Sequence, residues 1–339
     1  MKNIVRNALA CALVLSPIYV WACASCGCTL SSDWESQGFT SQAGWKLDLR
    51  YDYLNQNQLR SGTGMISAGA ASQIVNSNGN QEVEKFTKNQ YYTATIDYSG
   101  SAAWGVSLQV PYIDRKHSTL GTNSDGYTPG GLLGNGDGGE YDSKTSDLGD
   151  VKVIGRYQGF TPQHNFGILI GLKLPTGSHT KTGTATDVTL PPGTPAPIDP
   201  GLQPGTGSTD AILGAYYFDA INKDWGYFTQ ATYQSSISTR TGYKPGDGLN
   251  ANFGLRYLGY DGVTPQIQLN ARHVAHDTGS LADTISTGGT LVYLSPGMVV
   301  PLTKKISVYG FVQLPVYQKV NGVQLAPKFT ASLGVHISF

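Results

Sequence analysis

Apolar and polar side chains alternate along residues 146–177, in two segments joined by a short connection. In the second segment every other residue is apolar, namely Phe166, Ile168, Ile170, Leu172 and Leu174. This period of two predicts β-strands, and the proline-bearing residues 159–163 between the segments predict an antiparallel hairpin. Ile154 and Leu169 break the alternation. Each strand is about ten residues long, which exceeds the usual length in a soluble sheet and approaches that of a bilayer-spanning strand.

The same alternation recurs up to the C-terminus of the chain. Residues 45–53 place apolar or aromatic side chains at odd positions and charged side chains at even positions. Aromatic residues gather at the strand ends, where an aromatic girdle of a membrane barrel would lie. Further strands are expected at residues 92–98, 104–112, 209–219, 225–236, 249–258, 264–274, 285–295, 305–315 and 328–339.

The predicted connections alternate between long and short along the chain. Residues 55–87, 113–146 and 176–208 form long connections, whereas 99–102 and 159–163 form short ones. An outer-membrane barrel with both termini in the periplasm shows this segregation, and it has an even number of strands. We therefore predict an all-β protein, a transmembrane antiparallel up-and-down β-barrel of about twelve strands, formed by residues 44–339.

The composition narrows the class of protein. Of the 339 residues, 14% are charged, and the mean hydropathy of −0.20 together with the lack of a long apolar run after the N-terminus excludes a helical membrane protein. A transmembrane barrel passes that test because only alternate residues face lipid. The formal net charge of zero gives no electrostatic reason to expect a nucleic acid as a partner.

The N-terminus has the pattern of an export signal. Lys2 and Arg6 precede an apolar segment at residues 8–20, and residues 22–24 have the small side chains that a signal peptidase accepts. We expect residues 1–24 to be a signal peptide, residues 25–43 to be a cysteine-containing tail, and the mature chain to lie in the cell outer membrane. In an alternative interpretation, residues 20–23 are a lipobox and Cys23 is the lipidated first residue.

Cys23, Cys26 and Cys28 lie in or beside the signal, so no disulfide is expected within the barrel. Cys26 and Cys28 could pair with each other, pair with a partner, or have no role. A sharper hypothesis is that they serve a redox partner, because a short N-terminal cysteine pair looks like that of the barrel subunits in porin–cytochrome conduits. The chain has no Cys-x-x-Cys-His motif and hence no c-type haem attachment site of its own.

The last residue, Phe339, ends an alternating strand that starts at residue 328. This C-terminus resembles the strand that the barrel-assembly machinery recognises in outer-membrane proteins. The resemblance implies that this machinery is a partner of the chain during membrane insertion.

Two short motifs border the central hairpin. Residues 147–151 read DLGDV and residues 171–177 read GLKLPTG. They resemble the "GLGD" and "KLPTG" segments of the outer-membrane transporter family associated with the meta-cleavage pathway of phenol degradation, although Asp147 replaces the first glycine. The resemblance implies a barrel for the uptake of small, often aromatic or hydrophobic compounds, and it brings no catalytic residues.

The polar faces of the predicted strands are expected to line the lumen. In one interpretation they form a paired polar network that fills a narrow barrel, and in the other their basic groups form a constriction that selects solutes. The predicted lumen-lining residues are Lys46, Asp48, Arg50, Asp52, Asp97, Lys152, Arg156, Lys173, Arg256, Arg272 and Lys328.

Other chemistry is weakly indicated. His273 and His276 near one strand end could bind a metal, but two histidines without further ligands are more often a solvated loop edge. No nucleophile motif supports a hydrolase, and Asp137 and Glu140 lack the spacing of a calcium loop. We therefore expect no catalytic residues, no metal and no cofactor.

The sequence favours a passive channel or transporter for small molecules, with loops 113–146 and 176–208 gating a polar lumen. Its expected partners are outer-membrane lipid and a small solute. The alternative function is a scaffold or sheath for a periplasmic redox partner, such as a multihaem cytochrome.

Overall fold

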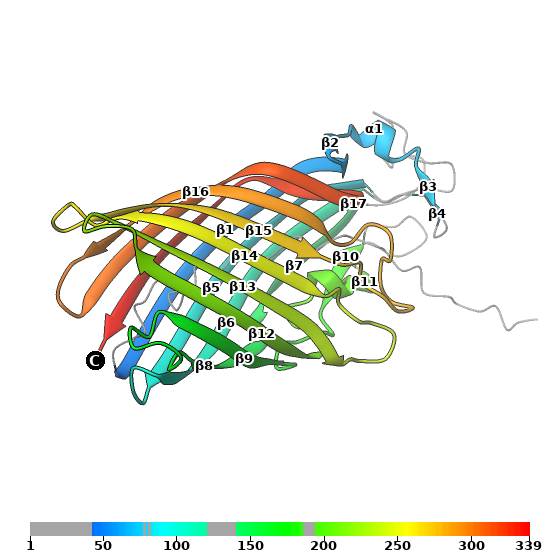
Figure 1. The fold of residues 1–339 in the computed structure, drawn as a ribbon. Coiled ribbons are helices and arrows are strands. Elements are labelled where there is room, and N and C mark those ends of the chain that lie inside the picture. The colour runs from blue at the N-terminus through cyan, green and yellow to red at the C-terminus, as the bar shows by residue number, and fades with distance from the viewer. Residues whose placement is uncertain (1–42, 77–78, 81–82, 121–139, 186–193) are drawn as a thin grey trace, which may run out of the picture.

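The computed structural model describes residues 43–76, 79–80, 83–120, 140–185 and 194–339. These residues form one closed, all-antiparallel barrel with strands tilted relative to its long axis (Figure 1). In the described residues no helix is long and apolar enough to cross a membrane. The predicted fold class is confirmed.

The barrel wall is built from long strands. They are β1 (Gly44–Gly62), β5 (Val83–Ser99), β6 (Trp104–Leu120), β7 (Glu140–Leu148), β8 (Val151–Tyr157), β9 (Phe166–Leu174), β12 (Thr209–Ala220), β13 (Trp225–Ser238), β14 (Gly248–Tyr257), β15 (Thr264–Val274), β16 (Gly289–Pro301) and β17 (Ile306–Ser338). Short elements decorate one end, namely β2 (Gly64–Met65), α1 (Ala68–Ala71), β3 (Val75–Asn76), β4 (Gly79–Asn80), β10 (Thr182–Ala185), β11 (Thr194–Pro197) and the 3-10 helix η3 (Pro200–Leu202).

The ring closes through eleven elements in the order β6-β5-β1-β17-β16-β15-β14-β13-β12-β9-β8, because β6 pairs with β8 as well as with β7. One of these elements, β17, is a hairpin. Its first arm pairs with β16 and its second arm with β1, and the Ser338 amide donates a hydrogen bond to the Lys305 carbonyl at 2.8 Å. When both arms of β17 are counted, the described chain contributes twelve strands to the wall of the barrel.

The two ends of the barrel differ as the connection lengths predict. Gly44 and Phe339 lie at one end, which we call the terminal end, and the Phe339 amide donates to the Trp45 carbonyl at 3.0 Å. The short hairpins gather at this end, on the left of Figure 1. The helix α1 and strands β2, β3, β4, β10 and β11 lie at the opposite end, which we call the loop end.

Several predicted boundaries are wrong because strands continue past the membrane at the loop end. Strand β1 extends to Gly62, β6 extends into the expected loop 113–146, and the expected connection 316–327 lies entirely within β17, where Gly322 has a positive φ. A small apolar cluster with Ala71, Val83 and Val323 covers this extension, so the strands bury side chains beyond the bilayer. The strand expected at 285–295 differs in the other direction, because it begins later at the loop end and continues farther toward the terminal end, over Gly289–Pro301.

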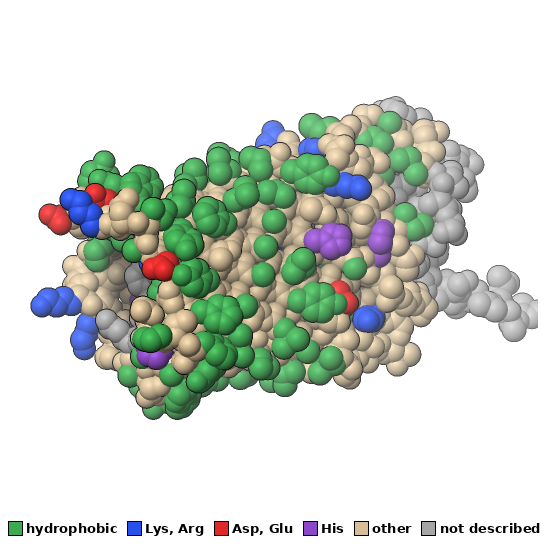
Figure 2. Space-filling model, viewed as in Figure 1, with side chains coloured by type: hydrophobic (Ala, Val, Ile, Leu, Met, Phe, Trp, Pro, Cys, Tyr) green, Lys and Arg blue, Asp and Glu red, His purple; other side chains and the backbone are tan. Residues whose placement is uncertain are grey.

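The wall is apolar on its outer side and polar on its inner side. Hydrophobic side chains cover the outer surface in Figure 2, and charged side chains gather toward the two ends of the strands. In β9, Ile170 and Leu172 are exposed, whereas Lys173 is buried inside. An exposed apolar band around a polar interior is the arrangement expected for strands in lipid.

Inside the barrel, aromatic rings lie across glycines of neighbouring strands. Tyr216 lies opposite Gly167, Phe228 opposite Gly254, and Phe311 opposite Gly297. A Cβ atom on any of these glycines would lie within 2.3 Å of the facing ring. Glycine therefore provides the space in which large inward side chains lie flat against the wall.

Aromatic residues mark both edges of the apolar band on the outer surface. At the terminal end, the ring centroids of Trp45 and Tyr98 are 4.8 Å apart, and those of Trp225 and Tyr257 are 5.0 Å apart. Toward the loop end, the rings of Tyr51 and Tyr92 are 5.2 Å apart. These two girdles fit the interfaces between the hydrocarbon and water, where an amphipathic ring is favoured.

The depth of an outward residue sets the cost of placing a charge there. Ile170 lies at the middle of β9 and is 61% exposed, whereas Ile237 lies at the loop end of β13 and is 64% exposed. We expect Ile170→Lys to lower the free energy of unfolding in lipid vesicles by about 2–4 kcal/mol and Ile237→Lys by about 0–1 kcal/mol. Denaturant titration in vesicles measures both, and equal losses would contradict the assigned depths.

Candidate functional site

The lumen at the loop end is occupied by residues 198–208, which we call the plug segment. Ile198 and Leu202 are buried against each other around η3. The Gln203 side chain fixes this turn, because its amide nitrogen donates to the carbonyls of Lys181 and Ile198 at 3.0 Å each. The segment is thus a folded unit inside the barrel.

A buried cluster of charges ties the plug segment to the wall. The Lys173 ammonium lies 3.2 Å from an Asp150 carboxylate oxygen and 3.0 Å from an Asp210 carboxylate oxygen. It also donates hydrogen bonds to the hydroxyls of Thr206 and Ser208, which belong to the plug segment. All three charged side chains are nearly inaccessible to solvent. We call Asp150, Lys173 and Asp210 the latch.

The two carboxylates of the latch are satisfied by further donors. Asp150 accepts from the amides of Gly177 and Thr206 at 3.0 and 2.9 Å. Asp210 accepts from the hydroxyls of Ser208 and Ser236 at 2.7 and 2.8 Å. Buried charges are tolerated only when paired and hydrogen-bonded, so the latch depends on the plug segment being in place.

The latch explains why the two motifs that border the central hairpin occur together. Asp150 comes from the first motif and Lys173 from the second, and the Thr176 hydroxyl bridges them by accepting from the Val151 amide and donating to the Gly149 carbonyl. A Cβ atom on Gly177 would lie 2.7 Å from the Gly205 Cα and 2.9 Å from the Gly149 carbonyl carbon. Three glycines therefore let the two motifs and the plug segment meet backbone to backbone.

Arg115 of β6, the strand next to β8 in the wall, is a second anchor of the plug segment. It is buried, and its guanidinium donates to the Gly201 carbonyl at 3.1 Å and to the Asn89 side chain at 2.5 Å. Asn89 in turn donates to Gln56 at 3.1 Å, and the Tyr91 hydroxyl accepts from Arg115 at 3.1 Å. The plug segment is therefore held by four consecutive strands of the wall, β6, β8, β9 and β12.

A cavity of about 350 Å³ lies between the plug segment and the wall. Its basic groups include Arg50, Lys152 and Arg272, and its apolar wall includes Ile113 and Ile154. The volume is at the lower limit of small-molecule pockets. A compact solute with an apolar body fits such a space.

An apolar inner patch continues from this cavity. Ile154, Leu169, Ile212 and Tyr216 form one buried cluster on β8, β9 and β12, with Phe218 packed against it. Ile154 and Leu169 are the two residues that break the alternation in the sequence. They do so because they place apolar side chains on the inner face.

The lumen near the terminal end contains another ion network. Arg156 forms a salt bridge with Asp97 and a hydrogen bond with Ser99, and the Lys46 ammonium lies 3.6 Å from the Asp97 carboxylate. The Cβ position of Gly105 is filled by the Arg156 guanidinium. This network joins β1, β5 and β8, so it narrows the lumen between the apolar inner patch and the terminal end.

The remaining predicted lumen residues are found in several environments. Arg50 pairs with buried Asp52 at 2.8 Å, and Asp48 accepts from the Tyr309 hydroxyl at 3.0 Å. Lys152, Arg256 and Arg272 are partly buried, and Arg272 donates to Asn250 at 2.9 Å. The pattern that assigned Lys328 to the lumen does not hold locally. A register shift between Leu54 and Gln56 leaves Lys328 and Phe329 both exposed in succession.

The loops between β13 and β14 and between β15 and β16 cover the plug segment. The buried Tyr243 hydroxyl donates to Asp277 at 3.0 Å, and the Gly246 amide donates to the same carboxylate at 2.8 Å. Burial raises the pKa of Asp277, and burial together with the neighbouring Asp277 and Asp199 raises the pKa of Tyr243 well above its usual range. Arg240 stacks on Tyr243 at 5.1 Å and donates to the His179 carbonyl at 3.4 Å.

The remaining predicted features are the cysteines, the signal peptide, the C-terminal residue and the candidate metal ligands. Cys23, Cys26 and Cys28, the proposed signal peptide and Asp137 lie outside the described residues, whereas Glu140 is the first residue of β7. Phe339 is 69% exposed at the terminal end. Within the described ranges, no group of three or more His, Cys, Asp or Glu side chains is arranged to hold a metal ion.

Sequence reasoning missed three residues that bind the plug segment, namely Asp150, Asp210 and Arg115. Asp150 was visible as part of a motif at the start of β8, but a motif does not reveal that its partner lies in a loop. Asp210 and Arg115 lie on the inner face of β12 and β6, where alternation predicts only a polar position.

Comparison with solved structures places the fold among outer-membrane barrels. An outer membrane channel from Pseudomonas putida F1 matches with a TM-score of 0.59 and 12% sequence identity, over 88% of this chain and 96% of that chain. No family model matches the chain, and no curated protein does either. At this identity the likeness shows the fold, an outer-membrane β-barrel.

Two other solved structures are less similar. The CymD monoaromatic hydrocarbon channel has a TM-score of 0.49 and 11% identity, over 96% of this chain and 99% of that chain. The toluene transporter TodX of Pseudomonas putida has a TM-score of 0.46 and 12% identity, over 91% of this chain and 93% of that chain. With TM-scores below 0.5, neither adds to the argument.

Removing the latch cation should free the plug segment. Lys173→Met leaves two buried carboxylates without their cation, and removing one partner of a buried ion pair costs about 3–5 kcal/mol. We expect faster protease cleavage in residues 198–208 and higher solute flux in vesicles. Lys152→Met is the matched control, because Lys152 lies directly opposite Lys173 on β8 and is less buried. Equal effects of both substitutions would contradict the latch.

The raised pKa of Asp277 predicts a pH dependence of the covering loops. A carboxyl group with a raised pKa in the folded state binds its proton more tightly there, so its contribution to stability is largest at low pH. That contribution is lost as the pH rises above 3.8, the ordinary pKa of an aspartate side chain, and passes through the raised pKa of Asp277. We expect the Gly246 amide to lose protection from hydrogen exchange over this window, after correction for intrinsic rates.

Asp277→Asn should abolish this pH dependence, because an amide does not titrate. Asp261→Asn, at an exposed turn of the terminal end, is the control and should leave the profile of the wild type. A variant at Asp277 with the wild-type profile would show that another group controls the loops.

Proposed function

We propose that this protein is an outer-membrane channel for the passive passage of small hydrophobic or aromatic molecules, with its terminal end in the periplasm. The observation that carries the proposal is the apolar inner patch of Ile154, Leu169, Ile212 and Tyr216, which adjoins the cavity inside the barrel. An apolar solute is favoured at such a patch by the hydrophobic effect.

The plug segment gives the proposed channel a gate. It closes the loop end through the latch and through Arg115, so that solute enters only when these contacts rearrange. The fold is similar to that of a solved outer membrane channel, which fits this class of function and fits a protein that is not an enzyme. The resemblance to the phenol meta-cleavage family supports the same solute class.

The alternative function, a sheath for a redox partner, finds no support in the described residues. The plug segment occupies the lumen at the loop end, and the network of Arg156, Asp97 and Lys46 narrows it near the terminal end. A cytochrome would need this space. The cysteine tail, on which the alternative rests, lies outside the described residues.

Flux through the purified protein in vesicles tests the proposal. We expect a neutral phenol to pass faster than a sugar of similar volume, and Ile212→Gln to reduce the phenol flux by roughly tenfold, equivalent to about 1.4 kcal/mol, without changing the sugar flux. Leu213→Gln is the control, because Leu213 is the next residue of β12 and faces outward with 55% exposure. Equal flux of both solutes in the wild type, or no effect of Ile212→Gln, would refute an apolar path.

A further inference from the structure

Three lysines lie side by side on the outer surface near the loop end. Lys88 of β5 is the register partner of Lys116 on β6, and Lys116 is the partner of Lys144 on β7. They share the outward parity of the exposed Tyr92 and Tyr112, and the Lys88 ammonium lies 5.4 Å above the ring of Tyr53. Like charges directly opposite in a sheet repel each other, so this lysine row needs a counter-anion.

The chain supplies only part of that counter-charge. Asp114 and Asp142 share the outward face of β6 and β7, diagonal to the lysines, which leaves the group with one excess positive charge. Within the described residues, none of the three lysines has a carboxylate within the 4.0 Å of an ion pair. A row of ammonium groups suits an anion with several acceptor oxygens.

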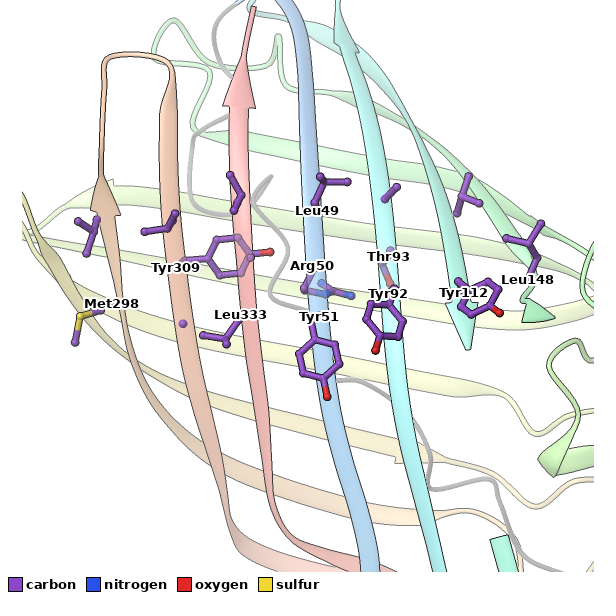
Figure 3. A pocket seen from close by; sticks show the side chains of 17 residues that line it. Leu49, Arg50, Tyr51, Tyr92, Thr93, Tyr112, Leu148, Met298, Tyr309 and Leu333 are labelled. Carbon is purple, nitrogen blue, oxygen red and sulfur yellow. The ribbon is translucent and has the colours of Figure 1, made fainter. Parts of the chain in front are cut away.

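An apolar groove of about 1010 Å³ runs along the outer surface on the terminal side of the lysine row. Its edge nearest the row is a line of register partners across four strands, namely Tyr51, Tyr92, Tyr112 and Leu148. Figure 3 shows these side chains together with Leu49 of β1, Leu333 of β17 and Met298 of β16. The small residues Ala94 and Gly310 line the same groove and leave it open to the lipid.

The distance from the groove to the lysine row matches the distance from the acyl chains of a lipid to its headgroup. Along each strand the lysine lies four residues beyond the aromatic edge, as from Tyr92 to Lys88 and from Tyr112 to Lys116. At about 3.3 Å per residue and a tilt of about 40°, this is roughly 10 Å along the membrane normal. With the tyrosines at the hydrocarbon interface, the lysines lie at the level of the headgroups.

We propose that this surface binds a phosphorylated lipid of the outer leaflet, with its phosphates on Lys88, Lys116 and Lys144 and its acyl chains in the groove. The inference rests on the proposed outer-membrane location with the loop end outside, but it does not depend on solute passage. It assigns a role to charges that the candidate channel does not use.

Native mass spectrometry of the delipidated protein in a zwitterionic detergent tests this site. The probes are diphosphoryl lipid A, which carries phosphates and acyl chains, and phosphatidylcholine, whose headgroup has no net charge. We expect the wild type to bind the first lipid more tightly, and the triple variant Lys88→Gln/Lys116→Gln/Lys144→Gln to bind it roughly tenfold more weakly. Ala94→Phe should weaken both lipids, because it fills the groove.

The matched control is Lys223→Gln/Lys304→Gln/Lys305→Gln, which removes the same charge from exposed turns at the terminal end. It should bind as the wild type does. A loss below about threefold in the first triple variant, or an equal loss in the control, overturns the proposal. A difference in gel migration between heated and unheated samples (heat modifiability) confirms that each variant is folded. The phenol flux of the first triple variant, expected at the wild-type level, separates a failure of the lipid site from a failure of the channel.

Discussion

The buried ammonium of Lys173 is the interaction on which the arrangement of the lumen depends. It joins β8, β9, β12 and the plug segment through two carboxylates and two hydroxyls. A lysine in this position would be strongly destabilising without those partners, and the carboxylates would be so without the lysine. The site is therefore stable only as a complete set, and completeness requires that the plug segment be inside the barrel.

The rest of the lumen follows the same rule with other residues. Polar side chains from facing strands satisfy each other, as in the networks of Arg115 with Asn89 and of Arg156 with Asp97. Aromatic rings take the remaining space by lying over glycines. Both sequence-based interpretations of the inner face thus apply in part. A paired network fills the barrel, and basic groups such as Lys152 and Arg272 still border the cavity.

Alternation alone predicted the fold class and most of the strands, because the two sides of a membrane barrel meet solvents of opposite polarity. The alternation failed to predict strand residues beyond the bilayer, where the two sides of the wall no longer face environments of opposite polarity. Beyond the bilayer, strand residues such as Val323 and Leu325 are buried against loop-end elements, so the pattern there looked like a connection. At Lys328 a register shift removed the periodicity on which the assignment to the lumen relied.

The latch was accessible to sequence reasoning only in part. The motifs containing Asp150 and Lys173 were recognisable, and their residues meet because a hairpin brings its two ends together. That Thr206 and Ser208 complete the site could not be predicted, since the long connection 176–208 has a composition that indicates only a loop. The sequence showed Ile154 and Leu169 as exceptions to the alternation. Only the structure shows that they belong to an apolar inner patch beside a cavity.

The central claim is that a folded plug segment closes a path that otherwise runs through the barrel. Single-channel conductance of a chain in which residues 198–204 are replaced by a Gly–Ser linker of equal length tests it most directly. The claim predicts a persistently open pore with a conductance well above that of the wild type. A conductance that stays at the wild-type level would contradict it, because the path would then be closed by the wall itself.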